Sequence, residues 1–225
     1  PRIPVHLPQT SPRRFRGSNM NCEVFSLAPL RCEAFQAKET LRAVLHTVLF
    51  SRTLGVVRAR DVDSELFDLT YTTCGDPSVE SHVEERLDAL VRWLAKQDRG
   101  KDTHAQVCLS FYETKDKKTG GWFGGGDERV YWEQWRIPLE VVGGDEALME
   151  MVDREANSAQ LQHTIVAAIQ HVIGLVNERK DHIPPVVSSE VVSFPYEISL
   201  PGESEGALFG SLKRMMLHAT PPSLV

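Results

Sequence analysis

Acidic side chains at alternate positions form the first pattern in the sequence that could bind a ligand. Asp61, Asp63 and Glu65 have the spacing that opens a calcium-binding EF-hand loop, in which carboxylates supply the oxygen ligands. Such a loop also requires a glycine at its sixth position and a glutamate at its twelfth, where this sequence has Leu66 and Thr72. The pattern therefore predicts an acidic turn before a strand, and no calcium site.

Cysteines and histidines are the other candidates for metal binding or catalysis. His163 and His171 lack a further His, Cys or acidic residue three or four positions away, so we predict no zinc site. His46 lies among the apolar positions of a predicted helix and is interpreted as a packed residue. None of the four cysteines has a partner at C-x-x-C spacing, which predicts free thiols in a reducing compartment; they are Cys22, Cys32, Cys74 and Cys108.

Sequence signatures of known catalytic centres are absent. The chain has no GxSxG, no Walker A motif, no GxGxxG before a helix and no HExxH. Paired acids such as Asp127 and Glu128 fall in a predicted loop, where solvation is their ordinary explanation. We therefore expect a protein that is not an enzyme and that uses no metal and no cofactor.

An aromatic pair flanked by glycines is the strongest functional candidate. It lies in residues 115–135, KDKKTGGWFGGGDERVYWEQW, where Trp122 and Phe123 are adjacent and five glycines surround them. Glycines add no packing and much backbone freedom, so the pair is typical of an exposed loop tip. We predict that Trp122 and Phe123 bind a partner protein; a small cluster packed under the sheet is the alternative. Trp132 and Trp135 are expected in the core.

Composition and charge restrict the class of protein. With 225 residues, 41% hydrophobic and 25% charged, the chain can form a globular domain with a sizeable core. Residues 1–19 carry four arginines and no acid, which leaves 21 Lys and Arg against 31 Asp and Glu in the rest, a net charge of −10. An acidic body argues against nucleic-acid binding. No apolar run approaches the length of a transmembrane segment.

Hydrophobic periodicity predicts a mixture of helices and strands. Three helices are indicated, over 37–51, from Pro77 to before Asp98, and over about 145–177, with apolar residues at i, i+3, i+4 and i+7. Alternating patterns predict strands over 22–31, 66–71, 105–113, 129–142 and 191–200. A short helix or cap is predicted around Leu208 to Met216. Pro138 should occupy an edge position or a bulge.

Several stretches of the chain match the pattern of one known family. They are LRAVLHTVLFSR (41–52), DVDSELFDLTY (61–71), LSFYETKDKK (109–118), the Trp122-Phe123 pair followed by YWEQW (131–135), AIQHVIGLVNERKDHIPP (168–185), FPYEIS (194–199) and LKRMML (212–217). From Met20 onward, over residues 20–217, the chain resembles the autophagy-related protein 101 family. The VLHTVL helix (44–49) found together with the Trp-Phe pair and the WExW block (132–135) is the most specific part of the resemblance.

The resemblance implies a HORMA fold of the α+β class, with a mostly antiparallel sheet backed by three helices. We accordingly expect a disordered extension over residues 1–19, a single HORMA domain over 20–218 and a frayed tail over 219–225. Residues 1–19 are interpreted as an upstream tail before a start at Met20, with a transit peptide as the alternative.

The resemblance also implies a function. Members of the family pair with and stabilise the HORMA domain of autophagy-related protein 13, within the autophagy-initiation kinase complex. They recruit downstream factors to the cytoplasmic site of autophagosome assembly through an exposed Trp-Phe finger, which corresponds to Trp122 and Phe123. Animal members have a proline between the two aromatic residues, whereas here they are adjacent. A peptide-capturing HORMA adaptor of a checkpoint or meiotic pathway, and a small Cys/His hydrolase, are the alternatives.

Overall fold

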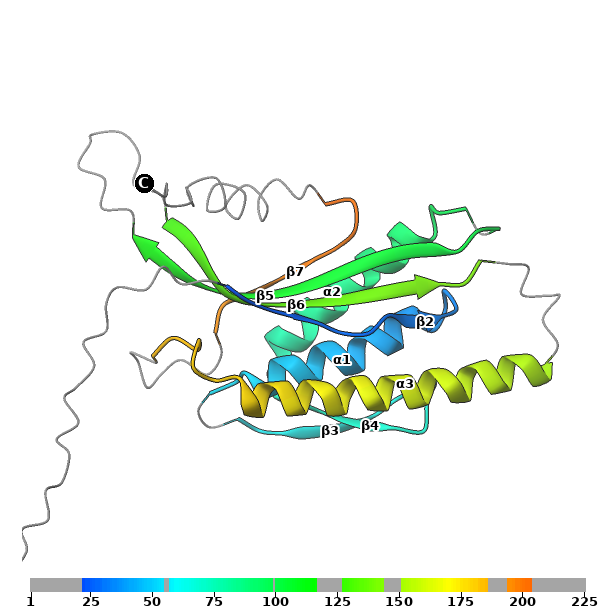
Figure 1. The fold of residues 1–225 in the computed structure, drawn as a ribbon, viewed down its shortest axis with the longest axis horizontal. Helices are drawn as coiled ribbons and strands as arrows, with labels where there is room; N and C mark the ends of the chain where they lie inside the picture. Colours follow the sequence, from blue (N-terminus) through cyan, green and yellow to red (C-terminus); the bar gives the residue numbers. More distant parts are fainter. Residues whose placement is uncertain are drawn as a thin grey trace, which may run out of the picture.

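The computed structural model describes residues 22–54, 57–98, 100–116, 127–143, 151–185 and 194–203. Its helices are α1 (Ala37–Ser51), α2 (Pro77–Leu94) and α3 (Met151–Glu178). Its strands are β1 (Glu23–Ser26), β2 (Leu30–Cys32), β3 (Arg60–Asp63), β4 (Thr70–Thr73), β5 (Thr103–Asp116), β6 (Asp127–Val141) and β7 (Tyr196–Ser199). The main sheet lies on one side of α1 and α3, and the β3–β4 hairpin lies beyond them (Figure 1).

Strands β5 and β6 form a long antiparallel hairpin that organises the main sheet. β7 pairs antiparallel with β5, and β1 and β2 both pair parallel with β6. The pairing of β6 with β1 ends at Arg136 and its pairing with β2 begins at Leu139. Pro138 therefore lies where this edge of β6 is interrupted, which is compatible with its lack of an N–H donor.

Helix α1 occupies the centre of the fold. Leu41, Val44, Leu45 and Val48 are fully buried, and the predicted apolar stripe is thus confirmed. The helix contacts α2, α3 and β4, so some of its polar residues, such as Thr40 and Thr47, are buried as well. Thr47 satisfies its hydroxyl by donating to the carbonyl of Ala43 at 2.8 Å. Burial of each large aliphatic side chain contributes about 1.5–3 kcal/mol, so α1 contributes substantially to core stability.

Local sequence signals explain where α2 begins. Asp76 is the N-cap residue and its carboxylate accepts a hydrogen bond from the Ser78 amide at 2.8 Å. Pro77 stands in the first helical turn, where its missing N–H costs nothing. The predicted stripe of Val83, Leu87, Leu90 and Leu94 is buried, but Val91 is 39% exposed. α2 therefore presents one apolar residue of the predicted stripe to solvent.

The prediction of an acidic turn followed by a strand over 66–71 is wrong. Asp61 and Asp63 lie in β3, and their carboxylates accept hydrogen bonds from the hydroxyls of Thr72 and Thr70 across the β3–β4 pair, at 2.8 and 2.7 Å. The connection between β3 and β4, residues 64–69, contains Phe67, and the Phe67 side chain is buried. Cross-strand hydrogen bonding to threonine lets acidic residues occupy a short exposed strand.

Several predictions fall outside the described residues. They concern the extension over 1–19, the frayed tail over 219–225 and the helix around Leu208 to Met216. Within the described part, three helices and a mostly antiparallel sheet confirm the predicted α+β class and are consistent with a HORMA-like fold. No helix there is long and apolar enough to cross a membrane.

Candidate functional site

The closed end of the β5–β6 hairpin carries the loop that holds the aromatic pair. The two strands remain paired as far as Lys115 with Glu128 and Asp116 with Asp127. Residues 117–126, which join them and include Trp122 and Phe123, lie outside the described residues. The structure therefore fixes the two ends of this loop and leaves the placement of both aromatic side chains a prediction.

Aromatic and ionic contacts link the closed end of this hairpin, next to the loop, to β7. The rings of Tyr112 and Tyr131 meet edge to face at 5.6 Å, and the Arg129 guanidinium lies 4.7 Å from the centre of the Tyr112 ring. Glu197 of β7 accepts hydrogen bonds from Arg129 at 2.8 Å and from the Tyr131 hydroxyl at 3.0 Å. Burial, followed by this contact with Glu197, raises the pKa of Tyr131. The strand ends that carry the loop are therefore held in place by these non-covalent contacts, which we refer to as the base of the loop.

A β-bulge next to this base places Trp132 in the core. Phe111 pairs with Glu133 and Tyr112 pairs with Tyr131, so Trp132 is the extra residue of β6. Trp132 is 1% exposed, and its ring meets that of Phe194 edge to face at 4.8 Å. The prediction that Trp132 packs in the core is confirmed. Strict alternation along β6 would set Trp132 on the face opposite to Trp135, and the bulge reverses that alternation.

Beneath the bulge, Glu133 is the centre of a buried polar cluster. Its carboxylate is 0% exposed and accepts two hydrogen bonds from Nε of Arg52, at 2.9 and 3.0 Å. The indole N–H of Trp135 donates to Oε1 at 2.6 Å, and Nε2 of His182 lies 2.6 Å from Oε2. A buried carboxylate is costly without such partners, so these contacts allow Glu133 to interrupt an apolar strand face.

The same cluster joins elements that are far apart in the sequence. Arg52 caps the C-terminus of α1 and also donates to the carbonyls of Val176 and Arg179, at 3.3 and 3.2 Å, at the end of α3. His182 follows α3, and Glu133 belongs to β6. We refer to Arg52, Glu133, Trp135 and His182 as the Glu133 cluster. It is a structural connection between both helices and the strand that carries the Trp-Phe loop.

The members of this cluster are not recognisable as a group in the sequence. Glu133 is an acidic residue within an apolar alternation, and Arg52 is a cation beyond the last apolar turn of a predicted helix, a position that suits the helix dipole. An acidic residue inside an apolar alternation signals a buried partner of opposite charge, but the sequence alone does not say which one.

Burial determines the protonation of two thiols and one imidazole in the described part of the chain. Burial raises the pKa of the Cys22 thiol to about 11 and that of Cys32 to about 12, so both are protonated at neutral pH. Burial lowers the pKa of His46, which stacks on the Tyr71 ring at 5.9 Å and is the packed residue that we predicted. The described residues contain no group of three or more His, Cys, Asp or Glu placed to hold a metal ion.

Comparison with known proteins assigns the family. A sequence model described as autophagy-related protein 101 matches residues 29–190, which include α1, α2, α3 and the whole β5–β6 hairpin. The chain belongs to the autophagy-related protein 101 family. Autophagy-related protein 101 of Arabidopsis thaliana is 37% identical over 92% of this chain and 100% of its own length. The proteins of the same name from Schizosaccharomyces pombe and Homo sapiens are 29% and 27% identical, over 81% and 80% of this chain and 89% and 84% of their own lengths.

Membership of the autophagy-related protein 101 family places the chain in autophagy. The matched range contains the loop with Trp122 and Phe123 as well as all four residues of the Glu133 cluster. The matched range therefore spans both the predicted interaction site and the Glu133 cluster.

Proposed function

We propose that this chain is a non-enzymatic scaffold subunit of the autophagy-initiation kinase complex. It pairs with the HORMA domain of autophagy-related protein 13, stabilises that domain, and recruits downstream factors through Trp122 and Phe123. It acts in the cytoplasm, at the site where the autophagosome assembles. Family membership supports the process, and the resemblance of the aromatic pair to the family's Trp-Phe finger supports the route of recruitment.

The observation that carries this proposal is the construction of the β5–β6 hairpin. The base of the loop, at the closed end of the hairpin, is held by contacts among Tyr112, Arg129, Tyr131 and Glu197. The ends of the loop are therefore fixed where strand pairing stops at Asp116. A loop with glycines on both sides of two large aromatic residues, mounted on such a base, is suited to present apolar surface to a partner. The raised pKa values of Cys22 and Cys32 disfavour these two thiols as nucleophiles, which weakens the hydrolase alternative.

Replacing Trp122 and Phe123 together by alanine is expected to separate pairing from recruitment. Co-purification with the HORMA domain of autophagy-related protein 13 should be retained, and the melting temperature should stay within about 2 °C, because exposed side chains contribute little to stability. Recovery of downstream autophagy factors with the purified pair should fall to background. Affinity capture followed by quantitative mass spectrometry provides the measurement.

Trp132→Ala is the matched control, because it removes a tryptophan from the same hairpin at a buried position. It should destabilise the fold by about 3–5 kcal/mol. A comparable loss of stability in the Trp122→Ala/Phe123→Ala variant would show that the pair belongs to the core and would contradict the proposed site. Failure to recover the partner HORMA domain with the wild-type chain, and recovery of a checkpoint or meiotic partner in its place, would support the alternative adaptor.

A further inference from the structure

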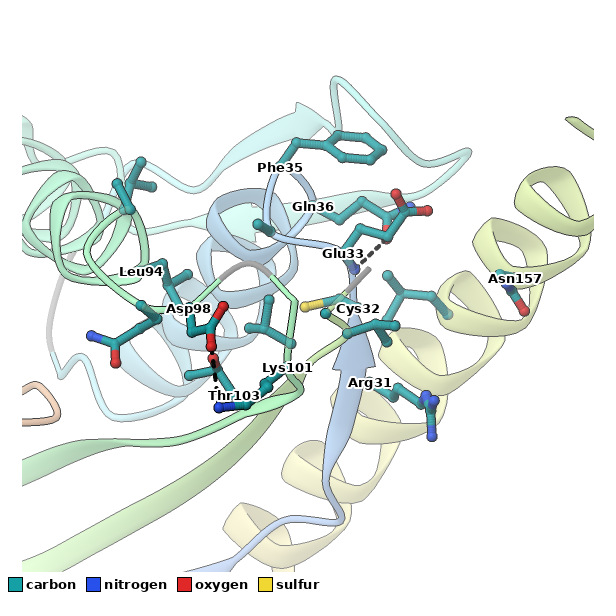
Figure 2. A pocket seen from close by; sticks show the side chains of 18 of the residues that line it. Arg31, Cys32, Glu33, Phe35, Gln36, Leu94, Asp98, Lys101, Thr103 and Asn157 are labelled. Atoms are coloured by element: carbon teal, nitrogen blue, oxygen red, sulfur yellow. Dashed lines mark hydrogen bonds and ion pairs between the residues drawn. The ribbon is translucent and has the colours of Figure 1, made fainter. Parts of the chain in front are cut away.

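An open groove of about 1130 Å³ lies at the other end of the β5–β6 hairpin (Figure 2). Side chains from β2 and the loop after it, from the end of α2 and the loop that follows, and from α3 surround it, together with the first residue of β5 and the last residue of β6. Its volume slightly exceeds the range of about 300–1,000 Å³ that is common for small-molecule pockets. A groove of this size can accept several side chains of a polypeptide.

The groove combines an apolar floor with exposed apolar residues at its rim. Leu94, Val141 and Leu161 line it and are at most 8% exposed. Phe35 and Val91 line it too, and they are 51% and 39% exposed. Exposed large apolar residues that gather around one concave surface are typical of an interaction site.

The wall formed by α3 is open along its N-terminal part. None of residues 155–160 is buried, and this part of the helix extends past the end of α1 (Figure 1). Asn157 and Gln160 of this part line the groove, and both residues are exposed. Their side-chain amides can donate to and accept from the backbone of a polypeptide segment.

Glu33 gives the groove its chemical preference. Its Oε1 atom is buried and has no hydrogen-bond partner in the described part of the chain. The loop around it is preformed, because the Glu33 amide donates to Oε1 of Gln36 at 3.0 Å and the Gln36 amide donates to the Glu33 carbonyl at 3.0 Å. A buried carboxylate oxygen without a donor is costly, and a cationic donor satisfies it best.

The other charged residues that line the groove leave this preference unchanged. Asp98 is paired with Lys101 at 3.3 Å and also accepts a hydrogen bond from the Gly100 amide at 3.0 Å. Arg31 of β2 is exposed to solvent, so its charge is screened by water. Glu33 is therefore the lining carboxylate with an oxygen that no donor satisfies in the described part of the chain.

We propose that this groove binds a segment of a partner protein. The segment places an aromatic or aliphatic side chain against Phe35 and Leu94, and a lysine or arginine close to it in sequence donates to Glu33. The interaction is separate from the proposed recruitment through Trp122 and Phe123, and it uses different residues.

The position of the groove suits a scaffold. Thr103 and Val141, the paired residues at the open end of the hairpin, both line it, whereas the Trp-Phe loop follows Asp116 at the closed end. The fourteen residues of β5 separate the two ends by about 45 Å at the usual rise per residue. Two partners could therefore bind at the same time without contact between them.

Selection of random short peptides displayed on phage, against the full-length chain, tests this proposal. We expect the selected peptides to share an apolar residue close to a lysine or arginine. A fluorescein-labelled synthetic copy of the best peptide should lose about ten-fold in affinity for Glu33→Gln, which removes the charge and keeps the shape. It should lose more for Phe35→Asp. Fluorescence anisotropy measures both.

Two controls keep the outcomes distinct. Ile173→Asp alters an apolar residue of α3 that is 46% exposed and does not line the groove, so affinity should be unchanged. The Trp122→Ala/Phe123→Ala variant should also bind normally, so that failure of the recruitment proposal leaves this one standing. The absence of enriched peptides, or peptides whose binding is insensitive to Glu33→Gln and Phe35→Asp, would overturn the proposal.

Sedimentation velocity of the unliganded chain tests for a different occupant. We expect the wild-type chain and the Phe35→Asp variant to sediment alike, as monomers. A wild-type dimer that Phe35→Asp dissociates would assign the groove to a second copy of the chain and would contradict binding of a partner protein.

Discussion

Replacing Arg52 by methionine is expected to lower the free energy of unfolding by about 3–5 kcal/mol, because it leaves the buried Glu133 carboxylate without its cationic partner. Arg52 and Glu133 side chains are 3% and 0% exposed, and Nη2 of Arg52 lies 2.8 Å from Oε2 of Glu133. The substitution also removes the donors to two carbonyls near the end of α3. Urea denaturation at constant m-value provides the measurement.

The double variant Arg52→Met/Glu133→Leu separates the loss of a charge pair from the loss of packing. Removing both charges leaves no uncompensated carboxylate, so the double variant should be more stable than Arg52→Met alone. Arg60→Met is the matched surface control, since Arg60 pairs with Glu80 at 2.9 Å with its side chain 61% exposed. It should change stability by at most about 1 kcal/mol. An Arg52→Met variant as stable as Arg60→Met would show that the Glu133 cluster contributes little.

Leu45→Asp is expected to prevent folding. Leu45 is 0% exposed in the middle of α1, which contacts α2, α3 and β4. A carboxylate there has no partner prepared for it, and its burial costs more than about 4–5 kcal/mol. A domain of this size has a total stability of about 5–15 kcal/mol, so little or no native protein should remain. Circular dichroism and thermal denaturation of any soluble fraction provide the measurement.

Leu45→Ala gives a graded version of the same experiment. It should leave a folded protein that is destabilised by about 2–5 kcal/mol, because it opens a cavity without burying a charge. Leu66→Asp is the exposed control, since Leu66 is 44% exposed, and it should change stability by at most about 0.5 kcal/mol. A Leu45→Asp variant with an unchanged melting temperature would contradict the placement of α1 in the core.

The elements with a long and regular hydrophobic period were predictable from the sequence. The stripe from Leu41 to Leu49 is buried as predicted, and so is most of the stripe in α2. The β3–β4 hairpin was not predictable in the same way, because the acidic residues of β3 resemble those of a turn. Their stability in a strand depends on threonine partners in β4, and pairing between strands cannot be read from either strand alone.

The interaction surfaces differ in the same respect. The Trp-Phe loop is a local feature, since two adjacent aromatic residues among glycines stand out in any sequence. The groove is not local, because its lining comes from five elements, which are β2, α2, β5, β6 and α3, and from the loops after β2, α2 and β6. Val91 illustrates the difference: its position in the period predicts burial, but it lines the open groove and is 39% exposed.

The α+β class, the three helices, the family and the aromatic pair Trp122-Phe123 can be recognised in the chain, because each depends on neighbouring residues or on short motifs. Three other features appear only in the folded protein: Arg52, Glu133 and His182 meet in one buried cluster, a bulge turns Trp132 into the core, and Glu33 and Phe35 share a groove with α2 and α3. Burial and charge pairing depend on contacts between distant segments, and local periodicity does not encode those contacts.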